Sequence, residues 1–333
     1  MSDVPTVTVL IPARNEEEDI ERCLRAVLAQ DHPHDRLDVV LVDGGSTDRT
    51  VEVASAVLAS GDLAWKILDN PVGTTPSNLN AGLQVAAGEL LCRVDARSIV
   101  PPDYVRVCSE VLHDQREVVV TGGAQVAVDD GSSMSVGIAR ALNNRYSMGG
   151  ARYRASARSG QTDTVYLGAF RTADLRAAGG WNEALPTNQD FDLSRRLAAR
   201  GVVWFDSRLS VGYVPRSTLT ALWKQYRRFG RAKVRYWRLT GDRPLPRQWL
   251  MLAVPPLAAS TIGLVVGSRR TRTAHLLVGA MGGVAACFVV EARGTAGPSG
   301  ALPARLKSAA AMAVVSTAWV TGVASEALTP SRS

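Results

Sequence analysis

The sequence predicts an α/β domain with a mostly parallel central sheet, followed by hydrophobic helices near the C-terminus. Through residue 210, short β-rich apolar runs alternate with segments of helical periodicity, which is typical of a parallel sheet with helices on both faces. After residue 247, long apolar runs replace this alternation. The composition of the 333 residues, 46% hydrophobic and 21% charged, conceals the difference between the two parts.

The expected elements follow in order along the first part. The run TVTVLIP at residues 6–12 has the apolar, β-rich character of a buried parallel strand. Asn15 is expected to cap the next helix, because three glutamates follow it and acids are favoured in a first helical turn. Residues 122–165 are rich in Gly, Ser and Arg and predict irregular chain. Further strands are predicted at 38–42, 65–68, 89–94 and 118–121, and helices at 47–59, 77–86, 103–112, 172–178 and 190–200.

Polar clusters stand where three of the predicted strands end, at residues 14–16, 43–46 and 95–97. Ligands bind at the carboxyl ends of the strands in parallel sheets, so the sequence predicts a binding site there. No Gly-Lys-Ser/Thr follows the Gly-containing stretch 73–82, and Pro-Ala-Arg stands where a dinucleotide fingerprint would begin. A P-loop NTPase and a dehydrogenase are therefore disfavoured.

The net charge of +7 is concentrated in one segment. Residues 216–247 hold ten Lys and Arg against one acid, and an amphipathic helix is predicted near 219–239. A basic strip just before an apolar run indicates an anionic membrane surface. Nucleic acid is the less favoured partner, because no nucleic-acid-binding module accompanies the strip.

Three apolar stretches, at about 249–267, 274–290 and 308–325, approach the ~20 residues that a membrane span needs. If the first one spans, the three arginines of residues 268–273 lie outside, against the positive-inside tendency. Its Pro-Pro pair also allows a re-entrant segment that places them inside, and both topologies stay open. The expected domains are residues 1–215, 216–248 and 249–326.

The first domain is expected on the cytoplasmic side of a multi-pass membrane protein, since no signal sequence precedes the first strand. The four cysteines and four histidines lie far apart, without the spacing of a zinc site or a disulfide framework. Reduced thiols are therefore expected.

Five motifs follow one another along the chain: VLIPARNEE (9–17), VDGGSTDRT (42–50), LNAGLQVAAGELLCRVDA (79–96), GGWNEALPTNQDFDLSRRL (179–197) and KQYRRF (224–229). In this order they resemble the large family-2 glycosyltransferases, and the resemblance covers about residues 7–229. Within the family the chain looks most like bacterial exopolysaccharide transferases of the succinoglycan-assembly kind. The resemblance implies a GT-A fold and inverting transfer of a sugar from a nucleoside-diphosphate donor, expected to be UDP-linked, to a lipid-linked or polysaccharide acceptor.

The resemblance assigns nucleotide binding to Asp43, whose carboxylate can accept a hydrogen bond from the N3–H of uracil. Backbone N–H groups of residues 44–46 are expected to approach the nucleotide. Many family members carry a second acid where Gly44 stands. An alternative is that Asp43 only caps a helix or forms the turn. The other residues expected to line the pocket are Pro12, Arg14, Glu16 and Ser46.

The family usually has Asp-x-Asp after the fourth strand, holding Mg²⁺ or Mn²⁺ on the diphosphate, and this chain has Asp95-Ala96-Arg97. The favoured interpretation is that Asp95 holds the metal together with water and donor phosphates. In the alternative, Arg97 or Arg93 pairs with the diphosphate and no metal is needed. Arg97 can also be a simple surface ion-pair partner.

Inverting transfer needs a carboxylate that takes the proton from the acceptor hydroxyl. In the family this base is the Asp of a Glu-Asp pair, which maps onto Asp190, with Gln189 in the Glu position. The change from Glu to Gln is expected to lower the pKa of the base. Asp192 is the competing base, and a helix-cap role for Asp190 is the structural alternative.

The expected acceptor-side residues are Gln225, Arg228 and Phe229, which resemble the Gln-x-x-Arg-Trp of processive sugar polymerases. They can equally be ordinary residues of an interfacial helix. Trp181 is expected either to stack on an acceptor sugar or to pack in the core.

Two other functions stay open. One is a polyprenyl-phosphate glycosyltransferase, whose phosphate acceptor needs no base. The other is a non-catalytic subunit that binds a nucleotide sugar, which the departures at Arg97 and Gln189 would explain.

Overall fold

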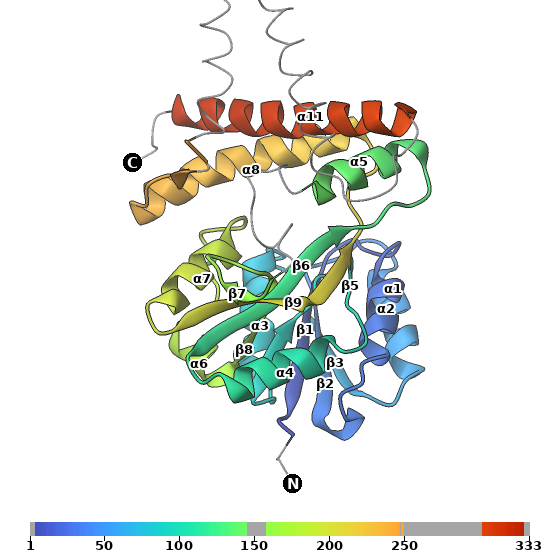
Figure 1. The fold of residues 1–333 in the computed structure, drawn as a ribbon. Coiled ribbons are helices and arrows are strands. Elements are labelled where there is room, and N and C mark those ends of the chain that lie inside the picture. The colour runs from blue at the N-terminus through green and yellow to red at the C-terminus, as the bar shows by residue number, and fades with distance from the viewer. Residues whose placement is uncertain (1–3, 145–157, 247, 250–301, 330–333) are drawn as a thin grey trace, which may run out of the picture. The chain divides into compact units, whose positions relative to one another are not determined.

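The computed structural model describes residues 4–144, 158–246, 248–249 and 302–329. The chain divides into two compact units, one of residues 1–126 with 156–213, the other of residues 127–155 with 214–333. The first unit contains the sheet (Figure 1). The second consists, in the part the structure describes, of helices.

The sheet of the first unit has the strand order β3-β2-β1-β4-β8-β6-β9-β5, with β7 paired to β9. Strands β3, β2, β1 and β4 pair with one another in parallel, as predicted. Beyond them, β8 runs antiparallel to both β4 and β6, so the sheet is mixed rather than parallel throughout. The strands are β1 (Val7–Ala13), β2 (Leu37–Asp43), β3 (Ala64–Asp69), β4 (Leu90–Arg93), β5 (Ser98–Ile99), β6 (Val118–Ala127), β7 (Gly160–Gln161), β8 (Tyr166–Arg171) and β9 (Val202–Tyr213).

Helices cover both faces of the parallel part of the sheet. Successive side chains of a strand point to opposite faces, and those of β1 are buried on both. Val7, Val9 and Ile11 of β1 pack in one core cluster with α1 (Ile20–Leu28), α2 (Thr50–Ala59) and α4 (Tyr104–Asp114). On the other face, Gly82 of α3 (Thr75–Val85) lies directly against the Leu10 side chain. A side chain at position 82 would collide there, so glycine lets α3 approach the sheet. The remaining helices of this unit are η1 (His34–Arg36), α6 (Thr172–Ala177) and α7 (Gln189–Ala198).

The prediction that Asn15 caps the first helix is wrong. Helix α1 begins at Ile20, and Asn15 has a left-handed backbone with φ of 54°. Its N–H donates to Ser46 Oγ at 2.9 Å, and its Oδ1 accepts from Thr47 N at 2.8 Å. Asn15 therefore joins the loop after β1 to the loop after β2. The sequence did not predict this contact, because the two loops are far apart in the chain.

The antiparallel half of the sheet also departs from the prediction. Strands β8 and β9 were not predicted, because polar residues such as Asp206 and Arg208 interrupt the apolar pattern of β9. Within the stretch predicted to be irregular, β6 continues to Ala127 and helix α5 covers Ser133–Asn143. The Ser132 hydroxyl caps α5 by accepting from Ser135 N at 3.3 Å.

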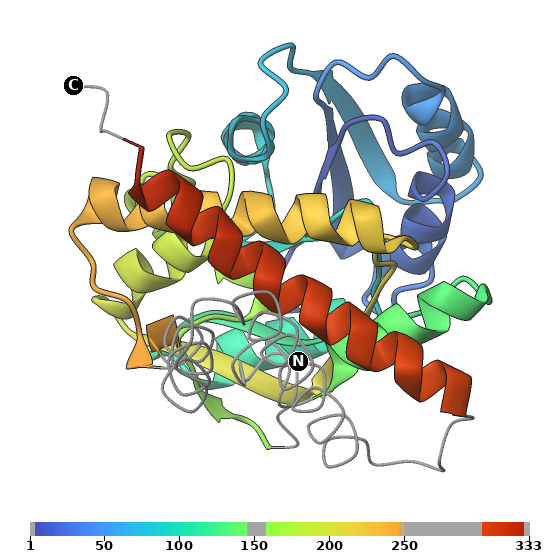
Figure 2. The same cartoon turned by 90° about the horizontal axis from the view of Figure 1, so that it is seen from above.

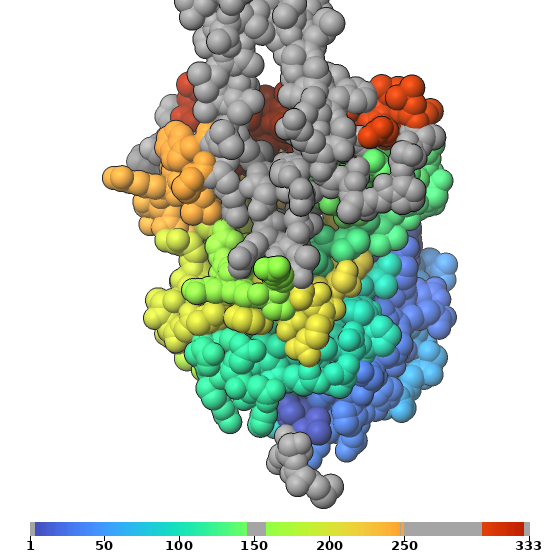
Figure 3. Space-filling view, in the orientation of Figure 1, coloured from blue at the N-terminus to red at the C-terminus, as the bar shows by residue number. Residues whose placement is uncertain are grey.

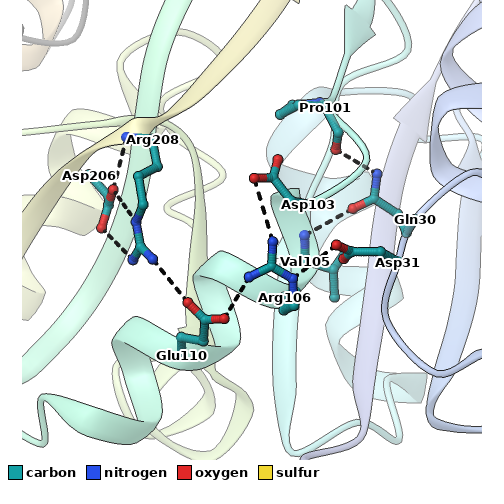
Figure 4. Close-up of polar contacts among 9 residues, drawn as sticks. All are labelled: Gln30, Asp31, Pro101, Asp103, Val105, Arg106, Glu110, Asp206 and Arg208. Carbon is teal, nitrogen blue, oxygen red and sulfur yellow. Dashed lines mark hydrogen bonds and ion pairs between the residues drawn. The ribbon is translucent and has the colours of Figure 1, made fainter.

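A surface network of ion pairs joins the two halves of the first unit (Figure 4). Arg106 of α4 pairs with Asp31 at 2.9 Å and with Glu110 at 2.6 Å. Arg208 of β9 reaches the same Glu110 at 3.0 Å and Asp206 at 2.9 Å. The surfaces of α4 and β9 adjoin on this face (Figure 3). Exposed pairs are individually weak, so the network contributes mainly by linking α4 to an antiparallel strand.

The second unit packs α5 and α8 (Leu219–Thr240) against α11 (Leu302–Ala327) (Figures 1 and 2). Its core contains Leu222, Ile138 and Met312, one from each helix. Within the residues that the structure describes, α11 alone is long and apolar enough to cross a membrane, and half of its most apolar window is buried. The predicted span 308–325 falls within α11, whereas the predicted spans 249–267, apart from its first residue, and 274–290 lie outside the described residues.

Candidate active site

The carboxylate of Asp43, at the end of β2, is held by the turn that follows it. Its Oδ2 accepts from the backbone N–H of Gly45 at 3.1 Å and of Ser46 at 2.9 Å. Its Oδ1 accepts from the Ser46 hydroxyl at 2.5 Å. Asp43 is only 6% exposed and its side chain bonds within this turn, whereas its contact with a nucleotide stays a prediction.

The backbone donors of this turn are engaged as well. Gly44 N donates to Ala13 O at 2.8 Å, and the next two N–H groups bond to Asp43. The expectation that these N–H groups approach a nucleotide does not fit this geometry, because all three already have partners within the protein.

The glycine at position 44 has a steric explanation. A Cβ there would lie 2.8 Å from Asn78 Nδ2 and 3.1 Å from the Gly73 Cα. Asn78 is buried and bonds to the carbonyl of Val42 at 3.3 Å, so it cannot move easily. The second acid of many family members therefore has no room in this chain.

The other predicted donor-side residues lie at the carboxyl end of β1. Pro12 is half-buried within the strand, and Arg14 is exposed, with its guanidinium 3.3 Å from the carbonyl of Gly73. With Ser46 bonded to Asp43, these residues border the ends of β1 and β2, where the sequence placed them.

Arg97 is committed to an ion-pair cluster. Its Nε donates to Glu16 Oε2 at 2.7 Å and lies 3.6 Å from Asp19 Oδ2. An adjoining recess of about 240 Å³ is lined by Asn15, Glu16, Glu17, Glu18, Asp48 and Arg97. Four carboxylates face one guanidinium in this recess, which makes it an unfavourable place for a diphosphate. The geometry thus fits the ion-pair interpretation of Arg97.

A second arginine, Arg93 at the end of β4, joins two predicted site residues. Its Nε and Nη2 donate to the two carboxylate oxygens of Asp95 at 2.8 and 3.2 Å. Its Nη1 donates to Asp190 Oδ1. The Arg93 side chain is 4% exposed, whereas those of Asp95 and Asp190 are 34% and 40% exposed. One buried cation therefore holds two accessible carboxylates side by side.

Burial disfavours the charge on Arg93, but Asp190 and Asp95 outweigh it and raise the pKa of the guanidinium. The cluster of one cation and two anions keeps a formal charge of −1. It is therefore better suited to a further cation than to a bare diphosphate.

Trp181 belongs to the core and not to a sugar-binding surface. It is 1% exposed and packs edge to face with Phe170, with ring centroids 5.9 Å apart. Its indole Nε1 donates to Asp190 Oδ1 at 3.3 Å. The prediction that it stacks on an acceptor sugar is wrong, because the ring is covered. Its N–H instead positions Asp190.

Asn80 of α3, which the sequence analysis did not single out, fixes the loop that carries Trp181. Its Oδ1 accepts from Trp181 N at 2.9 Å, and its Nδ2 donates to Trp181 O at 2.8 Å. The same Nδ2 also reaches Glu183 Oε1 at 2.8 Å. The position of Asn80 within the motif LNAG could have marked it as a candidate site residue, but the motif does not show what its side-chain amide contacts.

The two oxygens of Asp190 have different surroundings. Arg93 and Trp181 both donate to Oδ1. In the described part of the chain, the one donor near Oδ2 is Gln189 Nε2, at 3.5 Å. That distance is at the outer limit of a hydrogen bond, so Oδ2 keeps most of its capacity to accept a proton.

The pKa of Asp190 is raised. The partial burial of its carboxylate is the largest cause, the Arg93 charge opposes it, and the negative charge of Asp95 adds to it. The expected effect of Gln189, a lower pKa of the base than a Glu at that position would give, stays a prediction. A carboxylate with a raised pKa is a better general base.

Asp192 does not share these properties. It is 6% exposed, and its Oδ2 accepts from Arg196 Nε at 2.8 Å, one turn along α7. Asp190 is not the N-cap residue of α7, which is Asn188 with a φ of 71°, but it lies in the first turn of the helix. Asp190 is therefore the more accessible carboxylate of this segment, and its role as the base stays a prediction.

A divalent cation fits this site only if the protein supplies part of its ligands and the donor phosphates and water supply the rest. Among the residues that the structure describes, no three His, Cys, Asp or Glu side chains converge to hold a metal. Asp95 is one-third exposed, and each of its oxygens has a lone pair beyond the bond to Arg93. It can supply one ligand, as Mg²⁺ sites completed by substrate phosphates and water require.

The predicted acceptor-side residues lie in α8 of the second unit. Phe229 packs edge to face with Tyr226, at a centroid distance of 5.4 Å, and the Arg228 guanidinium lies 5.9 Å from the Phe229 ring centroid. Phe229 and Gln225 are half-buried, and Arg228 is exposed. These contacts are those of a packed helix, and an acceptor role stays a prediction.

Comparison with known proteins agrees with this fold. Residues 8–171 match the family described as glycosyl transferase family 2. The chain is 31% identical over 265 residues to the succinoglycan biosynthesis protein ExoA of Rhizobium meliloti (strain 1021), covering 78% of each chain. It therefore belongs to glycosyl transferase family 2.

Two more distant proteins are also similar. The dolichyl N-acetyl-alpha-D-glucosaminyl phosphate 3-beta-D-2,3-diacetamido-2,3-dideoxy-beta-D-glucuronosyltransferase of Methanococcus voltae is 23% identical over 234 residues, covering 68% of this chain and 72% of that protein. The mannosyltransferase PcManGT from Pyrobaculum calidifontis, solved with GDP-Man and Mn²⁺, superposes with a TM-score of 0.65 at 20% identity, covering 98% of this chain and 88% of that one. The fold is of the GT-A type, as predicted.

Proposed function

We propose that this family-2 glycosyltransferase acts with inversion, moving a sugar from a UDP-linked donor to a hydroxyl of a lipid-linked or polysaccharide acceptor at the cytoplasmic face of the membrane. The observation that carries the proposal is the state of Asp190. Its Oδ1 is anchored by Arg93 and Trp181, and its Oδ2 is left to act.

Asp190 Oδ2 takes the proton from the acceptor hydroxyl as the hydroxyl oxygen attacks the anomeric carbon. The bond from that carbon to the diphosphate oxygen breaks on the opposite side, and its electron pair leaves with the nucleoside diphosphate. Attack from the side opposite the leaving group inverts the anomeric configuration. Because Oδ1 stays bonded to Arg93 and Trp181, the carboxyl group keeps its orientation when it is protonated.

On the donor side, we assign Asp43 the role of shaping the turn of residues 44–46 against the nucleotide. Both of its oxygens already accept from that turn, so any bond to the N3–H of uracil uses a remaining lone pair. Pro12 and Arg14 complete this side from the end of β1.

Asp95 would hold Mg²⁺ or Mn²⁺ together with the donor phosphates. Such an ion offsets the negative charge of the departing nucleoside diphosphate. The commitment of Arg97 to Glu16 and Asp19 favours this assignment over a metal-independent reaction in which Arg97 binds the diphosphate.

The names of the relatives support the acceptor class. One takes part in succinoglycan biosynthesis, and another transfers to a sugar carried on dolichyl phosphate. A phosphate acceptor, as in a polyprenyl-phosphate glycosyltransferase, would need no base. The open oxygen and raised pKa of Asp190 therefore favour a hydroxyl acceptor.

A thermal-shift panel followed by product analysis tests the proposal. The full chain is heated with UDP, GDP, dTDP or CMP, each with Mn²⁺, Mg²⁺ or EDTA, beside Asp43→Ala. We expect UDP with metal to raise Tm in the wild type and not in the variant. Equal stabilisation in EDTA would refute the metal assignment, and no response to any nucleotide would refute donor binding.

NMR of the product then decides the stereochemistry. Transfer from a UDP-sugar should give a glycosidic bond of opposite anomeric configuration to the donor. Retention would exclude Asp190 as a base in a single displacement.

A further inference from the structure

Helix α8 is too strongly charged to lie within a bilayer. Its 22 residues include seven Lys and Arg and no acid. Lys224, Arg227 and Arg228 are exposed on its surface. Charged side chains in the hydrocarbon region are costly, so a helix of this composition stays in the interface or in water.

Helix α11 lies along α8 in the same direction (Figures 1 and 2). Gly322 sits on the backbone of Arg227, and Gly230 sits on the backbone of Trp319, so the two helices approach most closely between paired glycines. Further along, Arg238 donates to the carbonyl of Thr329 at 3.0 Å. From Arg227 to Arg238 the two helices stay in contact over about 16 Å, at the helical rise of 1.5 Å per residue.

Both ends of α11 are fastened to helices that carry charge. Near its C-terminal end, Glu326 is buried and pairs with Arg231 at 2.9 Å and with Arg235 at 2.7 Å, both of α8. Near its N-terminal end, Lys307 donates to the hydroxyl of Ser133 at the start of α5. Half of the most apolar window of α11 is buried, and residues of α11 pack against α5 and α8, while polar contacts hold its ends.

We infer that α11 does not cross the membrane but is a surface helix that clamps the basic helix α8, so that both of its ends lie on the side of the membrane that holds α8. A crossing α11 would carry the aligned α8 into the bilayer together with Lys224, Arg227 and Arg228. This inference goes beyond the proposed function, and labelling tests it without any measurement of transfer.

Cysteine accessibility tests the inference in the full chain. Leu306→Cys and Leu328→Cys introduce thiols at exposed positions near the two ends of α11, and Thr220→Cys on α8 reports its side. Cells and inside-out vesicles of the expression host are treated with a membrane-impermeant maleimide, and the unchanged chain gives the blank. Cys23, Cys92 and Cys108 are buried.

We expect both α11 thiols to label in the same preparation as Thr220→Cys and to stay at the blank level in the other. Labelling of the two ends from opposite sides would overturn the inference. A failure of both thiols to label from either side would also overturn the inference, because Leu306 and Leu328 are exposed where α11 packs on α5 and α8.

A second measurement examines the clamp itself. Glu326→Gln keeps the shape of the side chain and removes its charge, whereas Thr321→Ser changes an exposed position of the same helix. Hydrogen exchange of α8 amides around Arg231 and Arg235 should be faster in Glu326→Gln and unchanged in Thr321→Ser. Unchanged exchange in both variants would refute the clamp.

Discussion

Asp43 and Asp190 lie in the same unit, yet the chain holds their carboxylates in opposite ways. The partners of Asp43 are two and three residues away, and they occupy both of its oxygens. The firm partners of Asp190 come from Arg93, 97 residues away, and from Trp181, and they occupy one oxygen. A carboxylate saturated by its own turn is a scaffold, whereas one anchored on a single oxygen keeps the other for chemistry.

The largest expected effect is that of Asp190→Asn, which removes the base and keeps its shape. We expect kcat to fall by about 10³, within the range for loss of a general base, with nucleotide affinity unchanged. Asp192→Asn is the matched control on the same helix and should keep kcat near the wild-type value. If the two variants lost activity equally, the assignment of the base would be wrong.

Arg93→Met removes the guanidinium that anchors Oδ1 of Asp190. It leaves Asp95 and Asp190 without their shared cation, so the free energy of unfolding should fall by about 2–4 kcal/mol, less than for a fully buried pair because both acids are partly exposed. We also expect kcat to fall by about 10²-fold, since the base loses its orientation.

Urea unfolding and steady-state kinetics measure the two effects of Arg93→Met separately. Arg97→Met serves as the control, because its pairs with Glu16 and Asp19 lie outside the Asp190 cluster. Wild-type stability of the Arg93 variant would mean that the cluster does not hold the site together.

Asp43→Asn tests the scaffold. The amide cannot accept all three bonds of the turn without turning its NH₂ group toward one of the donors. A loss of 1–2 hydrogen bonds predicts about 10-fold weaker UDP binding, with kcat at saturating donor nearly unchanged. Calorimetric titration with UDP measures the affinity. A lower kcat with unchanged affinity would place Asp43 with the reacting groups instead.

Trp181→Phe should give the smallest loss of kcat among these variants, and it tests one hydrogen bond alone. It keeps an aromatic ring against Phe170 and deletes the single N–H bond to Asp190, so kcat at neutral pH should fall by about 5-fold, the value of one hydrogen bond. The base works deprotonated, so kcat rises as pH passes through its pKa.

The raised pKa of Asp190 places this acid limb above the ordinary range for an aspartate, about 3.9. Losing the Trp181 donor, which favours the carboxylate, should move the limb to still higher pH. A purely structural loss would lower kcat at every pH without moving the limb. The Phe170→Leu variant, which disturbs the same packing without touching the bond, is the comparison.

The parallel half of the fold was predictable because buried apolar runs mark β1, β2 and β4, and helices alternate with its strands along the chain. Strands β8 and β9 depend on partners distant in the chain, and β9 keeps Asp206 and Arg208 in the middle of its sequence. Local periodicity records neither the pairing nor the direction of such strands, so β8 and β9 were not predicted.

The sequence by itself determined the family, the order of the polar loops and the choice of Asp43, Asp95 and Asp190, because residue type and spacing carry that information. Only the tertiary structure decided what each group touches. In the folded chain Trp181 is buried, Arg97 pairs with Glu16, the space beside Gly44 is filled, and Arg93 pairs with two acids. Contacts between residues far apart in the chain follow from how strands and helices pack, and no local pattern records that packing.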